Sequence, residues 1–157
     1  MPVPTALSEK TGNGPAENLE TMDGNGTIWD PLRKKEVALT PEERVRQWFI
    51  GVLSSEVEVP LHLMMSEVPM TYGRKRWRAD ILVYDRNASP LLVVECKRPS
   101  VELDRTVLEQ AVRYNMVLDV RYIVITNCNS TYGAEKRDGG FDFISEIPKY
   151  GLLACPS

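Results

Sequence analysis

Histidine is almost absent from this chain of 157 residues, in which His62 is the only one. Sites that need two or more histidines from one chain, such as HExxH zinc hydrolases and HNH-type nucleases, are therefore excluded. A Ser-His-Asp triad would have to use His62, which lies in the apolar segment LHLMM. We interpret this histidine instead as a partly buried residue of the core or of a strand.

The chain also lacks the features that direct proteins to membranes or to oxidising compartments. No apolar run approaches the roughly 18 residues of a membrane span, and the start, MPVPTALSEKTGNG, has no charged-then-apolar signal pattern. Cys96, Cys128 and Cys155 lie far apart and form no CxxC pair, which suits a reducing compartment. We therefore expect a cytoplasmic protein with no membrane partner.

Positive charge is not in excess, because 19 lysines and arginines face 22 acidic residues and the net charge is -3. A nucleic-acid-binding domain is usually basic, so such a role would need a local basic patch or metal ions that offset phosphate charge. With 43% hydrophobic residues the chain can bury one core, and we expect one domain over residues 28–157. Residues 1–27, rich in Gly, Pro and Asn, are predicted to form a disordered tail.

A helix start signal follows residues 28–39, a segment that we expect to form an irregular arm or a short strand. Thr40 is placed to cap the helix, Pro41 suits its first position and Glu43 its third. Apolar residues then recur at helical spacing, which predicts a helix to about Ser55.

The rest of the chain predicts a sheet with a crossover helix. Strands are expected over residues 61–68, 77–84, 91–97 and 121–126, with a shorter one at 141–144. An apolar side from Leu103 to Leu118 predicts a helix, and a strand-helix-strand step of this length favours a parallel pair. The order α-β-β-β-α-β predicts an α/β fold with an α+β mixed sheet of four to five strands, flanked by helices.

The turn after the second of these strands determines how two acidic residues lie. If it centres between Asn87 and Ala88, cross-strand partners have numbers that sum to about 175, and Asp80 and Glu95 satisfy this sum. Their Cβ atoms would then lie roughly 5 Å apart on one face of the sheet. Lys97, two residues after Glu95, points to the same face.

Two carboxylates this close repel each other, and burying their charge costs several kcal/mol unless it is compensated. Mg²⁺ (or Mn²⁺) would compensate it, because such ions take one or two carboxylates together with waters and phosphates, and the Cys96 carbonyl could add a ligand. This predicts hydrolysis of a phosphodiester, in which Lys97 positions the water or stabilises the developing charge. The alternative is a structural ion pair of Lys97 with Glu95 or Asp80.

Beyond these three residues, a longer ordered set of motifs resembles a known family. The segments TPEERVRQWFI, WRADILVYD, VVECKRP, QAVRYN and VITN, within residues 30–132, are similar to the N-terminal nuclease domain of type I restriction enzyme R subunits, in the PD-(D/E)xK nuclease superfamily. The resemblance implies a restriction-endonuclease-like core in which Asp80 and Glu95 bind the metal and Lys97 is the catalytic lysine.

The resemblance also implies roles for residues on the two predicted helices. Gln110 and Tyr114 match the QxxxY element of such subunits, which lies beside the active site and contacts DNA; the alternative is a core aromatic and a surface glutamine. The acidic residue that the family carries on its first helix corresponds to Glu43 or Glu42. We assign Glu43, although a capping box also explains its position.

One feature of R subunits is not carried over. Those subunits continue into helicase-type ATPase domains, whereas this chain has no GxxxxGK[ST] loop, so ATP-driven translocation is not expected of it. The expected partners are DNA and either a second copy of the chain or subunits of a restriction system.

Cations cluster around the predicted site in the sequence: Arg74, Lys75, Arg76, Arg78 and Arg98. Such residues could neutralise phosphates of a nucleic acid that leads into the site. The alternative is a solvated hairpin end in which Arg78 pairs with Glu67.

Together, these features predict an Mg²⁺-dependent endodeoxyribonuclease of restriction or defence type. The alternative is a catalytically silent module that keeps the nuclease fold and binds DNA or a restriction-system partner. An enzyme with Cys96 as nucleophile is disfavoured, because no second histidine or nearby base supports it.

Overall fold

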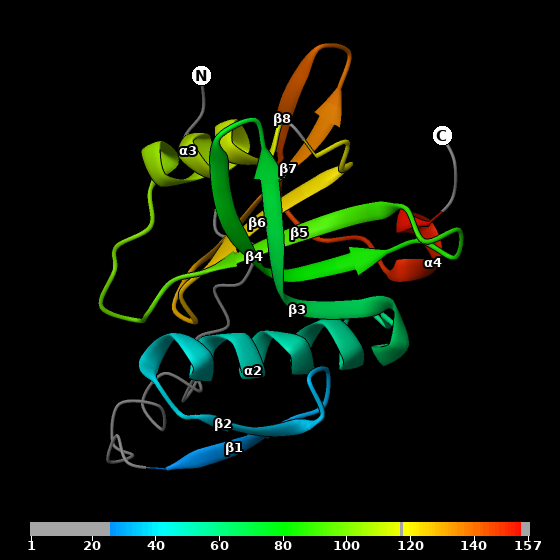
Figure 1. Ribbon diagram of the computed structural model, residues 1–157. Coiled ribbons are helices and arrows are strands. Elements are labelled where there is room, and N and C mark those ends of the chain that lie inside the picture. Colours follow the sequence, from blue (N-terminus) through cyan, green and yellow to red (C-terminus); the bar gives the residue numbers. More distant parts are fainter. Residues whose placement is uncertain (1–25, 117, 155–157) are drawn as a thin grey trace.

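The computed structural model describes residues 26–116 and 118–154 (Figure 1). Most of the tail predicted over residues 1–27 lies outside the described residues, as does Cys155. Among the residues that the structure describes, no helix is long and apolar enough to cross a membrane.

Two strands open the described chain and a mixed set of strands and short helices completes it. The elements in order are β1 (Thr27–Asp30), β2 (Lys35–Ala38), α2 (Pro41–Ser55), the 3-10 helix η1 (Leu61–Leu63), β3 (Met64–Tyr72), β4 (Lys75–Tyr84), β5 (Pro90–Cys96), α3 (Arg105–Asn115), β6 (Tyr122–Thr126), β7 (Thr131–Arg137), β8 (Gly140–Ile144) and α4 (Tyr150–Leu153).

The main sheet has the strand order β3-β4-β5-β6-β7-β8. Its β5 and β6 are parallel and joined through α3, whereas the other neighbouring strands are antiparallel. This confirms the predicted fold class and the predicted parallel crossover. The sheet has six strands rather than four to five, because β7 was not predicted: its sequence, TYGAEKR, is made of small and polar residues without an apolar run.

Two predictions for the N-terminal half need correction. The segment expected to be an irregular arm or a short strand is an antiparallel hairpin of β1 and β2. His62, expected to be partly buried, is exposed, because the chain makes the 3-10 turn η1 before it enters the sheet at Met64. It therefore belongs to neither a core nor a strand.

The predicted start of α2 is confirmed. The Thr40 hydroxyl accepts a hydrogen bond from the Glu43 backbone N–H at 3.1 Å, and Pro41 stands at the first helical position. The cap satisfies one of the N–H groups that every helix leaves unpaired at its start, and it fixes where the first turn of α2 lies.

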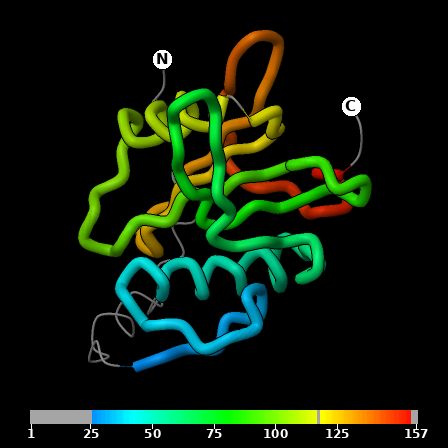
Figure 2. Tube along the Cα trace, viewed as in Figure 1, coloured from blue at the N-terminus to red at the C-terminus, as the bar shows by residue number. Residues whose placement is uncertain are grey.

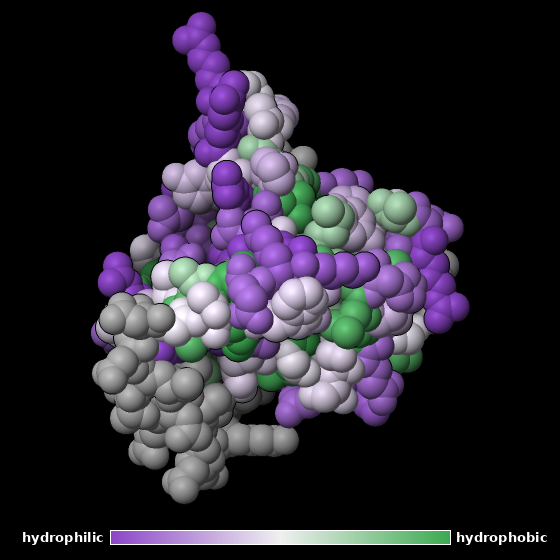
Figure 3. All heavy atoms as spheres, turned by 60° about the horizontal axis from the view of Figure 1, so that its bottom comes forward, coloured by the Kyte–Doolittle hydropathy of each residue, from purple (hydrophilic) through white to green (hydrophobic). Residues whose placement is uncertain are grey.

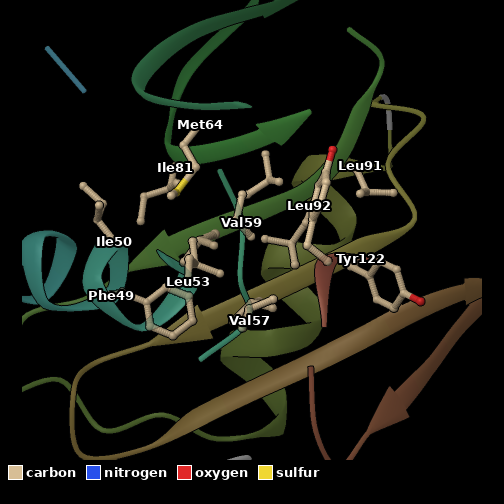
Figure 4. Packing of buried hydrophobic residues seen from close by; sticks show 14 of the residues in the cluster. Phe49, Ile50, Leu53, Val57, Val59, Met64, Ile81, Leu91, Leu92 and Tyr122 are labelled. Carbon is tan, nitrogen blue, oxygen red and sulfur yellow. The ribbon is translucent and has the colours of Figure 1, made fainter. Parts of the chain in front are cut away.

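A helix covers each face of the main sheet, α2 on one side and α3 on the other (Figure 1). On the α2 side, Phe49 and Leu53 pack toward Ile81 and Leu92 of the sheet, and all four are buried (Figure 4). A second buried cluster lies on the α3 side and includes Leu108. The face seen in Figure 3 is mostly hydrophilic, with hydrophobic residues in small separate patches.

The cap on α2 generates a stability prediction. Thr40→Ala should lower the free energy of unfolding by about 1 kcal/mol, because the Glu43 N–H loses its partner. Urea unfolding monitored by circular dichroism measures the change. Ser54→Ala, at an exposed position of the same helix, is the control and should be close to neutral. Equal effects of the two substitutions would contradict the capping role.

Candidate active site

The predicted register of β4 and β5 is confirmed where the ladder is regular. Ile81 pairs with Val94 and Leu82 with Val93, so partner numbers sum to 175, with an irregularity only at the turn. The ladder ends at the Ile81–Val94 pair, and the next residue of β4 is Asp80. The predicted pair of Asp80 with Glu95 would be the next step beyond this ladder, and it stays a prediction.

Strand β4 changes its orientation at Asp80. Residues two apart in a strand normally share a face, yet Ala79 packs in the cluster on the α3 side and Ile81 in the cluster on the α2 side. At this point the Asp80 side chain bonds to β5, because its Oδ2 accepts a hydrogen bond from the Cys96 backbone N–H at 2.8 Å. The bend thus places Asp80 directly against the segment that carries Glu95 and Lys97.

The second oxygen of Asp80 is also bonded. Its Oδ1 lies 2.8 Å from Nη2 of Arg46, a side chain of α2 that is only 4% exposed. The Asp80 side chain itself is 13% exposed. Asp80 is therefore a mostly buried carboxylate held by one backbone N–H and one guanidinium.

Glu95 and Lys97 lie together at the end of β5. Lys97 Nζ is 3.1 Å from Glu95 Oε1, and each side chain is about one third exposed, at 36% and 35%. Their common orientation agrees with the two-residue spacing. The ion pair also matches the structural alternative, so this contact alone does not decide between the two roles.

Both acidic residues at the start of α2 line a cleft beside this site. Desolvation raises the pKa of the exposed Glu42 above its usual range, and the nearby charge of Asp80 raises it further, while Arg46 and Lys97 act in the opposite direction. Glu43 is buried and contacts Arg33 and Arg46, and Arg46 in turn contacts Asp80. The assignment of Glu43 as the acidic residue of the site stays a prediction.

The possible metal ligands around Asp80 can be compared with those that a divalent ion requires. In the part of the chain that the structure describes, no group of three or more His, Cys, Asp or Glu side chains could hold a metal. Mg²⁺ accepts one or two carboxylates and carbonyl oxygens from the protein, together with waters. Asp80 and Glu95 can supply the carboxylates, and Cys96 the carbonyl oxygen. These oxygens fit a hard cation and would not suit zinc as a structural ion.

The Cys96 side chain takes no part in this chemistry. It is 1% exposed and packs in the cluster on the α2 side. Burial raises the pKa of its thiol well above the usual range, and the charge of Asp80 raises it further. A thiol held protonated is a poor nucleophile, which agrees with the prediction that Cys96 is not catalytic.

Helix α3, which carries the QxxxY residues, lies beside the β3–β4 hairpin (Figure 1 and Figure 2). Gln110 is exposed and Tyr114 is 45% exposed, which argues against a core role for the tyrosine. Lys75, at the hairpin end, lies over the Tyr114 ring with Nζ 5.2 Å from the centroid. No contact described for these residues joins Gln110 or Tyr114 to Asp80 or Glu95.

The predicted cations fall into two groups. Arg74, Lys75 and Arg76 are exposed at the end of the β3–β4 hairpin. Arg78 donates to Glu67 at 2.8 Å, as the alternative interpretation had it. The exposed Arg98 lines an open cleft of about 550 Å³, together with Arg33, Val37, Ala38, Thr40, Pro41, Glu42, Glu43, Arg46 and Glu67.

Sequence reasoning missed a chain of ion pairs behind the site. Arg33 contacts both Asp30 and Glu43, and Arg46 contacts Glu43, Asp80 and Glu67, the last at 2.7 Å. Asp30 is completely buried. The sequence signal was a lone aspartate in the apolar segment IWDP and two arginines, but their partners lie too far along the chain to be assigned by spacing.

Comparisons with known proteins agree with this architecture. A family model described as type I restriction enzyme R protein N terminus matches residues 41–148. The chain is similar to a fragment described as an HsdR subunit of a type I restriction enzyme from Vibrio vulnificus YJ016, at 18% identity and a TM-score of 0.53. That match covers 73% of this chain and 25% of the other, so this chain spans about a quarter of its length. No curated protein matches the sequence. The matches confirm the resemblance found in the motifs, and the structural match shows the fold.

Asp30, at the buried end of this chain of ion pairs, generates a prediction about the pH dependence of stability. Although burial raises the pKa of Asp30, the hydrogen bonds from the Arg33 side chain and from the Leu32 and Arg33 N–H groups bring it below its ordinary value of 3.8. The stabilisation is therefore complete well above pH 3.8 and is lost as the pH falls through the lower folded-state value.

Asp30→Asn should accordingly cost about 3 kcal/mol of unfolding free energy at pH 7 and much less at pH 3. Urea unfolding at the two pH values measures the difference, with Asp138→Asn, in the exposed turn between β7 and β8, as control. A loss that is the same at both pH values would refute the charged role of Asp30.

Proposed function

The chain belongs to the family of type I restriction enzyme R protein N termini, and on that premise we propose that it is a divalent-metal-dependent nuclease domain that hydrolyses phosphodiester bonds of DNA. The activity would be of the restriction or defence type. The observation that carries the proposal is the position of Asp80, bonded to the Cys96 N–H between Glu95 and Lys97.

The residues that would hold the ion are Asp80 and Glu95, with the Cys96 carbonyl as a further oxygen ligand and Glu42 as an additional acid nearby. This set suits Mg²⁺ or Mn²⁺. When bound, such an ion supplies Lewis-acid activation of a water molecule and of the phosphate. Desolvation and the neighbouring charge of Asp80 both raise the pKa of Glu42 and so oppose its ionised form, which supports the need for a cation here.

Lys97 would act on the charge that develops during hydrolysis. Attack of water on phosphorus breaks the bond to the 3′ oxygen and concentrates negative charge on the phosphoryl oxygens. An ammonium held 3.1 Å from Glu95 is placed to donate to a water or a phosphate oxygen next to that carboxylate. Its partial exposure leaves room for a substrate to approach.

The end of the β3–β4 hairpin is the proposed DNA contact. Arg74, Lys75 and Arg76 are exposed there, and Tyr114 offers an exposed ring beside Lys75. Contacts from such side chains go mainly to phosphates, so binding would be salt-sensitive and largely independent of sequence. Gln110 would add a polar contact from the same face of α3.

A second candidate function is a catalytically silent module that binds DNA or a restriction-system partner. The observation that favours it is Arg46, which already neutralises Asp80 within the protein. We also propose that double-strand cleavage would require either a second copy of the chain or other restriction subunits, because one site of this kind cuts one strand at a time.

Cleavage of supercoiled plasmid distinguishes the two candidate functions. With Mn²⁺ or Mg²⁺ the wild-type protein should nick the plasmid, and Asp80→Asn, Glu95→Gln and Lys97→Met should each reduce the rate by roughly 100-fold or more, as loss of a ligand or a charge-stabilising donor does. EDTA should abolish the wild-type activity. Conversion of supercoiled to open-circular DNA on agarose gels measures the rate.

Two substitutions at exposed positions serve as controls for this assay. Glu102→Gln and Lys35→Met remove the charge of a glutamate and of a lysine at exposed positions away from the Asp80 carboxylate. Both variants should nick at the wild-type rate. Retardation of DNA without cleavage under either metal would instead support the silent module. Full activity of Lys97→Met would remove the proposed catalytic role of that lysine.

The hairpin contact generates a prediction about salt dependence. Each phosphate contact contributes about 0.9 to the slope of log K against log salt, so replacing Arg74, Lys75 and Arg76 by Met should lower that slope by roughly 2 to 3. Fluorescence anisotropy with a labelled duplex measures it. The control replaces Lys34, Lys35 and Lys149, which removes the same charge from β1–β2 and the start of α4. Equal losses from both triple variants would argue against a specific hairpin contact.

A further inference from the structure

One buried guanidinium holds three carboxylates at the candidate active site. Arg46 Nη1 donates to Glu43, and Nη2 lies 2.7 Å from Glu67 and 2.8 Å from Asp80. These acids come from α2, β3 and β4, and the Arg46 side chain is 4% exposed. The predicted catalytic set does not contain this arginine.

Charge explains why the arginine is needed there. Three acids around one point, with Glu42 close by, would repel one another strongly in a buried site. An arginine guanidinium stays protonated in proteins, and Arg46 contacts Glu43, Glu67 and Asp80. Arg46 therefore supplies the positive charge that keeps these acids together.

Further ion pairs fix the position of Arg46. Glu43 is shared between Arg46 and Arg33, and Arg33 also contacts the completely buried Asp30. Asp30 accepts in addition the Leu32 N–H at 2.8 Å and lies 3.3 Å from the Ser66 hydroxyl. This chain of alternating charges fixes the guanidinium against the β1–β2 hairpin, so it cannot follow Asp80 if that side chain moves.

We propose that Arg46 is a positioning residue that acts as the resident counter-ion of Asp80 and competes with a divalent ion for that carboxylate. The inference rests on the proposed function, because it concerns the metal that the nuclease would use. The chain of ion pairs would then set the metal affinity of the site, in addition to stabilising the fold.

The sign of the effect follows from electrostatics. A divalent ion bound to Asp80 would stand close to the guanidinium, and two cations that share one carboxylate repel each other. Removing the charge of Arg46 relieves this repulsion and leaves Asp80 without its arginine, while Glu43 keeps Arg33 and Glu67 keeps Arg78. The Cys96 N–H still directs Asp80, so the ligand stays in place and metal binding should become tighter.

Calorimetric titration with Mn²⁺ tests the proposal without relying on nuclease activity. Arg46→Met should bind Mn²⁺ about tenfold more tightly than wild type, within the range by which partners of metal ligands alter affinity. Arg46→Lys, which keeps the charge, should stay within roughly threefold of wild type, or about 0.7 kcal/mol. The matched control is Arg78→Met, which removes the other arginine partner of Glu67, a side chain that is 69% exposed.

Thermal unfolding supplies a second readout. In EDTA, Arg46→Met should unfold about 10 °C below wild type, because it leaves the mostly buried Asp80 carboxylate without a cation. Saturating Mn²⁺ should recover most of that difference, since the ion then takes the place of the missing charge. If Arg46→Met does not fold, Arg46→Gln removes the same charge while keeping an amide donor, and both measurements are made on that variant.

The outcomes separate the inference from the proposed function. Wild-type Mn²⁺ binding with unchanged or weaker affinity in the neutral Arg46 variants would overturn the competition and leave Arg46 as a structural ion pair. Absence of Mn²⁺ binding to the wild-type protein would overturn the proposed function itself, and the inference with it. Tighter binding in the neutral variants alone, with the Arg78→Met control unchanged, is the expected result.

Discussion

The region around Asp80 depends on the neutralisation of buried carboxylates by arginines. Removing a charged group from water costs several kcal/mol even after relaxation, unless an opposite charge with good geometry offsets it. Arg33 and Arg46 supply that charge in alternation with Asp30, Glu43 and Asp80. The same contacts join the β1–β2 hairpin, α2 and the bent strand β4, so the electrostatic requirement also fixes how these elements lie against one another.

The bend in β4 has a counterpart in the neighbouring strand. Glu67 has a positive φ of 54°, unusual for a residue with a side chain, and it is absent from the pairing between Ser66–Ile81 and Val68–Ala79. Such a conformation costs about 1–3 kcal/mol and persists where the surroundings hold it. Here the Glu67 carboxylate bonds to both Arg46 and Arg78. The ion pairs thus offset the strain where Asp80 leaves the regular ladder.

Much of the sheet could be predicted from sequence, because its determinants are local. The turn after Tyr84 fixes the β4–β5 register within a few residues, and the apolar run LLVVEC identifies a strand covered on both faces. The chain of ion pairs could not be predicted, since Arg46 and Asp80 meet across 34 positions and spacing carries no such information. The choice between Glu42 and Glu43 has a different difficulty: a capping pattern identifies a position along a helix but not the residue that faces a neighbouring strand.

The distribution of charge connects the fold to the proposed chemistry. The chain is acidic overall, yet Arg33 and Arg46 are committed to carboxylates around Asp80, while Arg74 to Arg76 lie exposed at the end of the β3–β4 hairpin. A nuclease needs negative charge to hold a metal and positive charge to hold a phosphate backbone, and the two would cancel if they were mixed. In the proposed function one hairpin would meet both demands, because Asp80 lies further along β4 than the exposed cations at the hairpin end. The net charge of the chain is therefore a poor guide to whether it binds DNA.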